Sequence, residues 1–181
     1  MLTAHLVVLA VLTNVLAPLG ILGWRMAGGP RADAPALGSP GAALLLVALV
    51  WGWHVPALLG AAQSSVLLSA GLYAAVALSA CLFWHAVFAD ADIRPWRSLA
   101  AVLSGMKAFG LLGVLLVLAP RPLYGPPVVA EAGAAGQWDQ NIGGLLFMAI
   151  SALGFLVAAV VIVTRVMARV EGRPGWTGGL P

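Results

Sequence analysis

The sequence predicts an all-α integral membrane protein, a bundle of about five transmembrane helices. Two observations on composition and pattern support this fold class. Of the 181 residues, 62% are hydrophobic and 8% are charged, whereas a soluble domain carries roughly 25% charged residues. The apolar residues form long runs of Leu, Ala and Val that lack the alternation of a β-barrel. Because a backbone amide or carbonyl without a hydrogen-bond partner is very costly in lipid, such runs are expected to be helices.

The apolar runs divide the chain into one transmembrane helical domain, 1–181, with a flexible tail over 170–181. Each run has about 20 residues or more, enough to cross a hydrocarbon core of about 30 Å at 1.5 Å per residue. No Lys or Arg precedes the first run, which favours a retained helix over a cleaved signal peptide. We expect the spans at 2–24, 41–62, 65–89, 98–119 and 140–166.

The segments between these spans are expected to be connections. "AAQSS" at 61–65 predicts a tight turn, so that the second and third spans form an antiparallel hairpin. A short charged loop is expected at 89–96 and a long, proline-rich loop at 119–138. Pro56 removes a backbone hydrogen bond and predicts a bend in the second span.

Basic residues set the expected orientation. With five spans, one side of the membrane holds Arg121 alone, and cytoplasmic loops collect Lys and Arg. The N-terminus is therefore expected outside and the C-terminus in the cytoplasm of a multi-pass protein of the bacterial inner (plasma) membrane. The cytoplasmic side would hold Arg25, Arg31, Arg94, Arg97, Arg165, Arg169 and Arg173.

The three histidines all lie in expected spans, where ionisable groups are rare and mark functional sites. Counted from the outer end of each span, His5 lies roughly 5 Å deep, His54 roughly 12 Å deep and His85 roughly 28 Å deep. His5 and His54 can therefore approach each other, whereas His54 and His85 cannot share a haem or a metal. For each histidine, the alternative is a neutral ring that is hydrogen-bonded to a neighbouring helix.

Met148 lies at about the same depth as His54, roughly 12 Å. Imidazole with a thioether suits copper, and the soft sulfur favours Cu(I). His5, His54 and Met148 are thus the candidate metal ligands, although a single core Met is more often a gap filler. Lys107, the only lysine, lies in the middle of the fourth span. We expect it to face the bundle or a wet cavity, or to extend toward the interface.

Polar residues open the last span in "GQWDQNIGGLLFM" (136–148). Asp139 or Asn141 is a plausible N-cap for this helix, where an acidic group is favourable. Gly143 and Gly144 allow a neighbouring helix to approach closely. A cap and a packing face explain the stretch without any chemistry.

Four segments in order resemble the CtaG-like (caa-type) family of membrane assembly factors for cytochrome c oxidase. "DQNIGGLLFM" (139–148) is similar to the family's Asp-Gln, Gly-Gly and Met signature, and "WHVPALL" (53–59) to its Trp-His-x-Pro segment. "CLFW" (81–84) resembles the end of its next helix, and "RPLYGP" (121–126) its Arg-Pro-Leu-Tyr segment. The chain is shorter than the family's pattern and has Leu9 where a second early histidine would stand. It also lacks histidines at the start of the third span.

The resemblance implies a role in maturing a haem–copper oxidase, with copper (Cu(I)) handled at an outward-facing site. It carries over His54, Asp139, Gln140 and Met148 as functional candidates. Further candidates are Trp53, Pro56 and Tyr124. The implied partners are oxidase subunits or another respiratory membrane complex, with the lipid bilayer and no nucleic acid. Two alternatives stay open: a scaffold or accessory subunit that binds no metal, and a small copper or solute transporter using Lys107 and His85. No nucleophile and base are arranged for catalysis, so we do not expect an enzyme.

Overall fold

A computed structural model describes residues 2–28, 37–124 and 132–171. These residues form seven α-helices and one π-helical segment, η1, which continues α1 into α2. In chain order the elements are α1 (Leu2–Val11), η1 (Leu12–Leu16), α2 (Ala17–Met26), α3 (Gly38–Trp53), α4 (Pro56–Ser64), α5 (Val66–Ile93), α6 (Pro95–Leu118) and α7 (Ala132–Glu171).

The expected fold class is confirmed: the chain is an all-helical, multi-pass membrane protein. Four helical stretches in the described ranges are long and apolar enough to cross a membrane, beginning with Leu2–Met26. Helices α3 and α4 make a fifth span if their 71° bend is counted within one crossing. The bend lies at His54 and Val55, directly before Pro56, as the missing amide hydrogen of proline predicts.

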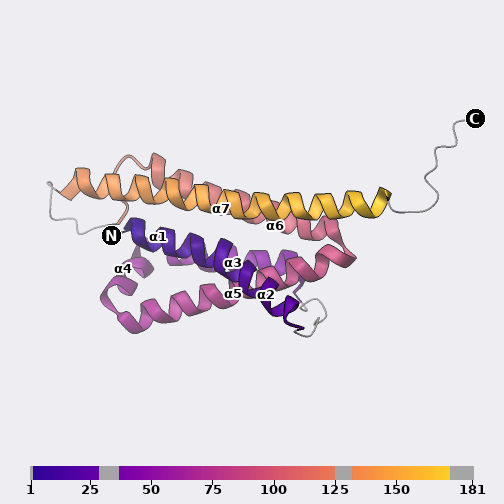
Figure 1. The fold of residues 1–181 in the computed structure, drawn as a ribbon. Coiled ribbons are helices and arrows are strands. Elements are labelled where there is room, and N and C mark those ends of the chain that lie inside the picture. The colour runs from indigo at the N-terminus through magenta and orange to yellow at the C-terminus, as the bar shows by residue number, and fades with distance from the viewer. Residues whose placement is uncertain (1, 29–36, 125–131, 172–181) are drawn as a thin grey trace, which may run out of the picture.

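Helix α7 is the axis against which the N-terminal helix and α6 pack (Figure 1). A Cβ at Gly143 would lie 2.8 Å from Leu6 Cδ1 and 3.0 Å from Thr3 Cα of α1. A Cβ at Gly144 would lie 3.0 Å from the Gly113 carbonyl oxygen of α6. The predicted close approach at both glycines is therefore confirmed, and each one faces a different neighbour.

The π-helical segment places polar groups in the middle of the first span. Its buried Thr13 carbonyl accepts a hydrogen bond from Trp84 Nε1 of α5 at 2.7 Å. Asn14 Nδ2 donates to Ser151 Oγ of α7 at 3.2 Å, and a Cβ at Gly154 would lie 2.9 Å from the Asn14 carbonyl oxygen. A π-bulge leaves backbone groups without their helical partners, and the neighbouring helices supply new ones here.

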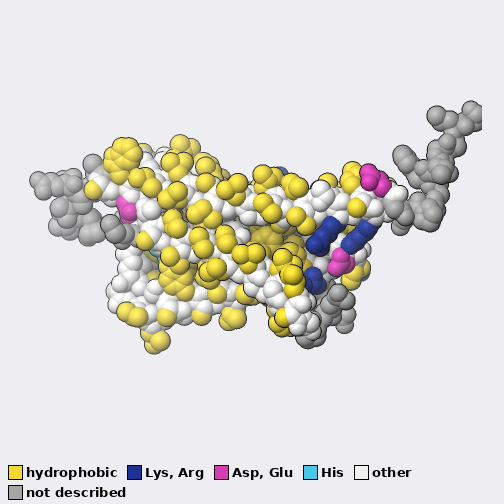
Figure 2. All heavy atoms as spheres, in the orientation of Figure 1, with side chains coloured by type: hydrophobic (Ala, Val, Ile, Leu, Met, Phe, Trp, Pro, Cys, Tyr) yellow, Lys and Arg dark blue, Asp and Glu magenta, His cyan; other side chains and the backbone are white. Residues whose placement is uncertain are grey.

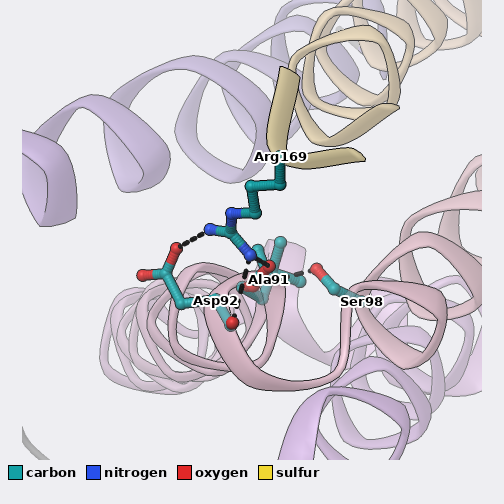
Figure 3. A network of polar contacts seen from close by, with 5 residues as sticks. Ala91, Asp92, Ser98 and Arg169 are labelled. Atoms are coloured by element: carbon teal, nitrogen blue, oxygen red, sulfur yellow. Dashed lines mark hydrogen bonds and ion pairs between the residues drawn. The ribbon is translucent and has the colours of Figure 1, made fainter. Parts of the chain in front are cut away.

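At the opposite end from the N-terminus, side chains again cap the helices around them. Asp90 Oδ2 accepts from the Ser39 amide at 2.9 Å and its hydroxyl at 2.7 Å, which caps the start of α3. Arg169 forms an ion pair with Asp92 at 2.7 Å and donates to two carbonyls at the end of α5, those of Ala91 and Asp92 (Figure 3).

Four expected boundaries differ from the observed ones. Helix α5 continues to Ile93 and α6 begins at Pro95, so the charged loop expected at 89–96 is reduced to Arg94. Proline is favourable in the first turn of a helix, so α6 can begin at Pro95. Asp90 belongs to α5 and accepts hydrogen bonds from Ser39 inside the fold. "CLFW" (81–84) lies inside α5 and not at its end. Helix α7 begins at Ala132, before the span start expected near 140, and its last described residue, Glu171, overlaps the expected tail.

The surface matches a bilayer environment, with hydrophobic side chains covering the length of the bundle (Figure 2). Most of the basic side chains visible in that view gather at the end remote from the N-terminus. This end holds the last turns of α2 and α7 and the α5–α6 junction. The expected grouping on one side is thus present for the described arginines of this set, whereas Arg31 and Arg173 lie outside the described residues.

Gly113→Ala should lower the stability of the bundle, whereas Gly110→Ala in the same helix should not. A Cβ at position 113 would lie 2.8 Å from Met148 Cβ and 3.0 Å from the Gly144 carbonyl, while nothing lies within 4 Å of one at Gly110. Overpacking of this kind costs about 1–3 kcal/mol, and alanine is otherwise the better helix former. Thermal unfolding of the detergent-purified protein measures both variants; equal melting temperatures would contradict the observed packing.

Candidate functional site

The polar stretch of α7 begins with Asp139, which caps α1. The amides of Leu2 and Thr3 donate to the two carboxylate oxygens at 2.5 and 3.4 Å, and Thr3 Oγ1 donates to the Asp139 carbonyl at 2.6 Å. The first amides of a helix have no partner within it, and a carboxylate there also interacts favourably with the helix dipole. The expectation that Asp139 or Asn141 caps its own helix is wrong, because α7 begins seven residues before Asp139.

Gln140 connects α7 to the end of α6. Its side chain is buried; Nε2 donates to the Leu116 carbonyl at 2.9 Å, and Oε1 accepts from the Leu123 amide at 2.8 Å. Gln137 Nε2 donates to the Ala119 carbonyl at 2.9 Å. The last carbonyls of a helix also lack partners, so both glutamines complete the end of α6 and hold the segment that follows it.

That segment carries Tyr124, which binds the backbone at the break between α3 and α4. Its hydroxyl donates to the His54 carbonyl oxygen at 2.7 Å. Burial raises the pKa of the Tyr124 phenol to about 12, so the hydroxyl keeps its proton at physiological pH. The His54 carbonyl, two residues before Pro56, therefore has a permanent donor, and the bend has a fixed position.

His5 of α1 and His54 lie together beside this break. Their ring centroids are 5.6 Å apart, which confirms that the two residues closest in expected depth can meet. Trp53 packs edge-on against His5 at 4.6 Å between ring centroids. Tyr73 of α5 completes the group, with its hydroxyl 2.7 Å from His5 Nδ1. Helices α1, α3 and α5 and the break after α3 thus contribute to one aromatic cluster, which we call the histidine site: His5, Trp53, His54 and Tyr73.

Both imidazoles keep one ring nitrogen without a partner. His54 Nδ1 lies 2.7 Å from the Val50 carbonyl oxygen, and because a carbonyl only accepts, Nδ1 carries a hydrogen. In the neutral ring, His54 Nε2 then has a free lone pair. His5 Nδ1 is bound to Tyr73, and Nε2 of each histidine is buried without a hydrogen-bond partner among the described residues. A buried polar atom of this kind is unusual and points to a missing ligand or water.

A cavity of about 250 Å³ opens beside the site. It lies between α1, α3, α4 and α5, and His5 forms part of its wall, whereas His54 lies behind, against Phe147 of α7 at 6.3 Å between ring centroids. The wall combines apolar and polar side chains, among them Trp53, Leu59, Gln63, Ser69 and Tyr73. Of the two histidines, His5 is the one that a small ligand in the cavity would contact.

Three other predicted residues lie elsewhere. Met148 packs against Gly113 of α6, while its neighbour Phe147 is the α7 side chain that faces His54. His85 lies beside Trp24 of α2, 6.2 Å between ring centroids, well separated from His54 as expected. Lys107 is exposed on the outside of α6, so two of its three expected placements, facing the bundle and facing a wet cavity, are wrong.

Sequence reasoning missed Tyr73 and Gln137. Tyr73 lies seven residues after the start of α5, about 11 Å along the helix, which is close to the depth expected for His54. The depth count applied to the histidines would have found it if it had included the two tyrosines. No sequence signal pointed to Gln137, because its role depends on where α6 ends.

Comparison with known proteins identifies a family. The sequence model of the cytochrome c oxidase caa3 assembly factor matches residues 1–169, which includes every helix of the bundle except the last two residues of α7. No curated protein and no solved structure matches the chain.

Asp139→Ala should loosen the first turn of α1, because it removes the acceptor for two amides. Loss of a cap costs about 1 kcal/mol, which corresponds to roughly fivefold faster amide exchange in the N-terminal segment. Hydrogen exchange followed by mass spectrometry measures this. Asp92→Ala, which removes an exposed carboxylate at the opposite end, is the matched control; identical N-terminal exchange in both variants would show that Asp139 is not a cap.

Proposed function

The chain belongs to the cytochrome c oxidase caa3 assembly factor family, and we propose that it delivers Cu(I) to an oxidase from the histidine site. The family supplies the link to the oxidase. The observation that supports copper is the adjacent pair of imidazoles, His5 and His54, each with a buried Nε2 that lacks a partner. In this proposal copper is the cargo of the protein, and the oxidase or another respiratory complex is its partner.

The hydrogen bonds behind each imidazole suit a metal ligand. Metal-binding histidines usually donate their second ring nitrogen to a carbonyl or another oxygen, which fixes the tautomer and the ring orientation. His54 does so to the Val50 carbonyl, and His5 pairs with the Tyr73 hydroxyl. The ring of His54 is thus held with Nε2 available, as neutral imidazole ligation requires. His5 presents Nε2 in the same way in the tautomer whose Nδ1 donates to the Tyr73 oxygen.

The small number of ligands favours Cu(I) among the biological metals. The described residues contain no group of three or more His, Cys, Asp or Glu side chains that could hold a metal ion. A tetrahedral zinc site needs more ligands than this, whereas Cu(I) can be held by two. Imidazole suits copper, and a site with few ligands also suits release to a partner. Met148, packed against α6, has no part in this proposal.

The site is proposed to face the outside of a bacterial plasma membrane. It lies at the end of the bundle with Arg121, whereas Arg25, Arg94, Arg97, Arg165 and Arg169 belong to helix ends on the opposite side. The excess of cations supports a cytoplasmic location for that second end. Tyr124, Asp139 and Gln140 then stabilise the outer end around the site, and we assign the protein no catalytic role.

A scaffold that assists the oxidase without touching metal is the competing function, and copper binding separates the two. The purified protein, loaded with Cu(I) under reducing conditions, should retain about one copper per chain. His5→Ala and His54→Ala should each abolish most of this binding, because two ligands cannot be reduced to one without a large loss of affinity. His85→Ala and Met148→Leu are the controls and should retain copper.

The same variants are compared for oxidase activity in membranes of the producing cells. His54→Ala should lower oxidase activity while the protein still inserts at normal levels, and His85→Ala should leave activity unchanged. Absence of copper from the unmodified protein, or copper retained in both site variants, would reject copper delivery and favour the scaffold.

A further inference from the structure

Lys107 occupies an unusual position on the outer surface of α6. Helix α6 buries Phe109, Leu112 and Leu116 inside the bundle, while Lys107 lies on the exposed side with Leu103 and Leu111. The spacing of Leu103, Lys107 and Leu111 places them along one stripe of the helix. The only lysine of the chain thus lies on a surface otherwise suited to lipid.

The lysine is too deep to reach either interface on its own. It lies twelve residues after Pro95 and eleven before Leu118, about 18 Å and 16 Å along the axis. Lysine can extend its stem toward the headgroups, but the stem is much shorter than either distance. A charge at this depth is costly, and such residues normally pair with another group.

Among the residues that the structure describes, Lys107 has no ion-pair partner. The ion pair of the described residues is Arg169 with Asp92, at the end of the bundle. The whole sequence contains six acidic residues: Asp33, Asp90, Asp92, Glu131, Asp139 and Glu171. In the described part of the chain they lie in the end turns of helices or beside the start of α1, and the other two fall between helices in the sequence. A second copy of the chain would therefore not bring a carboxylate to the middle of the membrane.

The surface around Lys107 has room for another helix. Ser104, one turn before it, is exposed, and a Cβ at Gly110, one turn after it, would meet nothing within 4 Å. Small residues allow transmembrane helices to approach closely. Ser104 and Gly110 thus leave space for a neighbouring helix on both sides of Lys107.

We propose that the Lys107 face of α6 is the docking surface for a transmembrane helix of another protein that carries an Asp or Glu near the middle of the membrane. The ammonium and the carboxylate form a charge-assisted hydrogen bond out of water, which explains a lysine at this depth. The inference that this helix belongs to an oxidase subunit rests on the proposed function; the docking surface itself does not.

Site-specific photo-crosslinking in native membranes tests the proposal. A benzophenone amino acid replaces Leu111 on the Lys107 face, or Leu78 on the exposed side of α5 as the matched control; these side chains are 53% and 72% exposed. The adduct at position 111 should contain a transmembrane peptide of another protein with a central Asp or Glu. It should fall at least tenfold in Lys107→Leu and Gly110→Leu and persist in Lys107→Arg. Lys107→Glu should lose it, and exchange of the partner's carboxylate for lysine should restore it.

The proposal is overturned if the adduct persists in Lys107→Leu, forms equally at position 78, or contains only lipid or a second copy of this chain. Oxidase content in cells that lack the protein is measured in parallel. A normal oxidase content in these cells would reject the proposed function but not the docking surface. If the oxidase content depends on the protein while the crosslink is unchanged in Lys107→Leu, only the docking surface is rejected.

Discussion

The structure depends on one constraint: helix ends in or beside a bilayer must find their hydrogen-bond partners on other helices. Water cannot serve the unpaired amides and carbonyls there, and each one left alone is costly. Asp139 serves the first amides of α1, and Gln140 serves the Leu116 carbonyl of α6. Asp90 does the same for the start of α3 at the opposite end. These contacts join segments far apart in the sequence, so they define how the helices are aligned along the membrane normal.

Close packing along α7 follows from this alignment. Once Asp139 and Gln140 have set its register against α1 and α6, Gly143 and Gly144 face the two neighbours at backbone contact distance. One turn and more below, Phe147 and Gly154 continue the contact toward His54 and Asn14. A polar stretch that looks like a functional motif is thus first a structural one, and its effect on the histidine site is to place α1.

The histidine site arises where regular helical bonding fails. Pro56 interrupts the second span and leaves the His54 carbonyl without a helical partner. The Tyr124 hydroxyl donates a hydrogen bond to this carbonyl. Because His54 lies at the break, its ring can turn back to the Val50 carbonyl and leave Nε2 unpaired. In a membrane, a polar atom without a hydrogen-bond partner is costly. The unpaired Nε2 of His54 therefore indicates a place where a ligand can bind.

The sequence by itself determined the fold class, the approximate spans, the bend at Pro56 and the grouping of the basic residues. Composition and local backbone chemistry decide these features, and the count of 1.5 Å per residue was enough to bring His5 toward His54. Tertiary structure alone decided that Asp139 caps α1, that Met148 turns to α6, and that Tyr73 joins the site. It also decided that Lys107 faces outward. These depend on which side of a helix meets which neighbour, and an almost uniformly apolar helix carries little pattern to reveal that, because lipid and protein interior favour the same side chains.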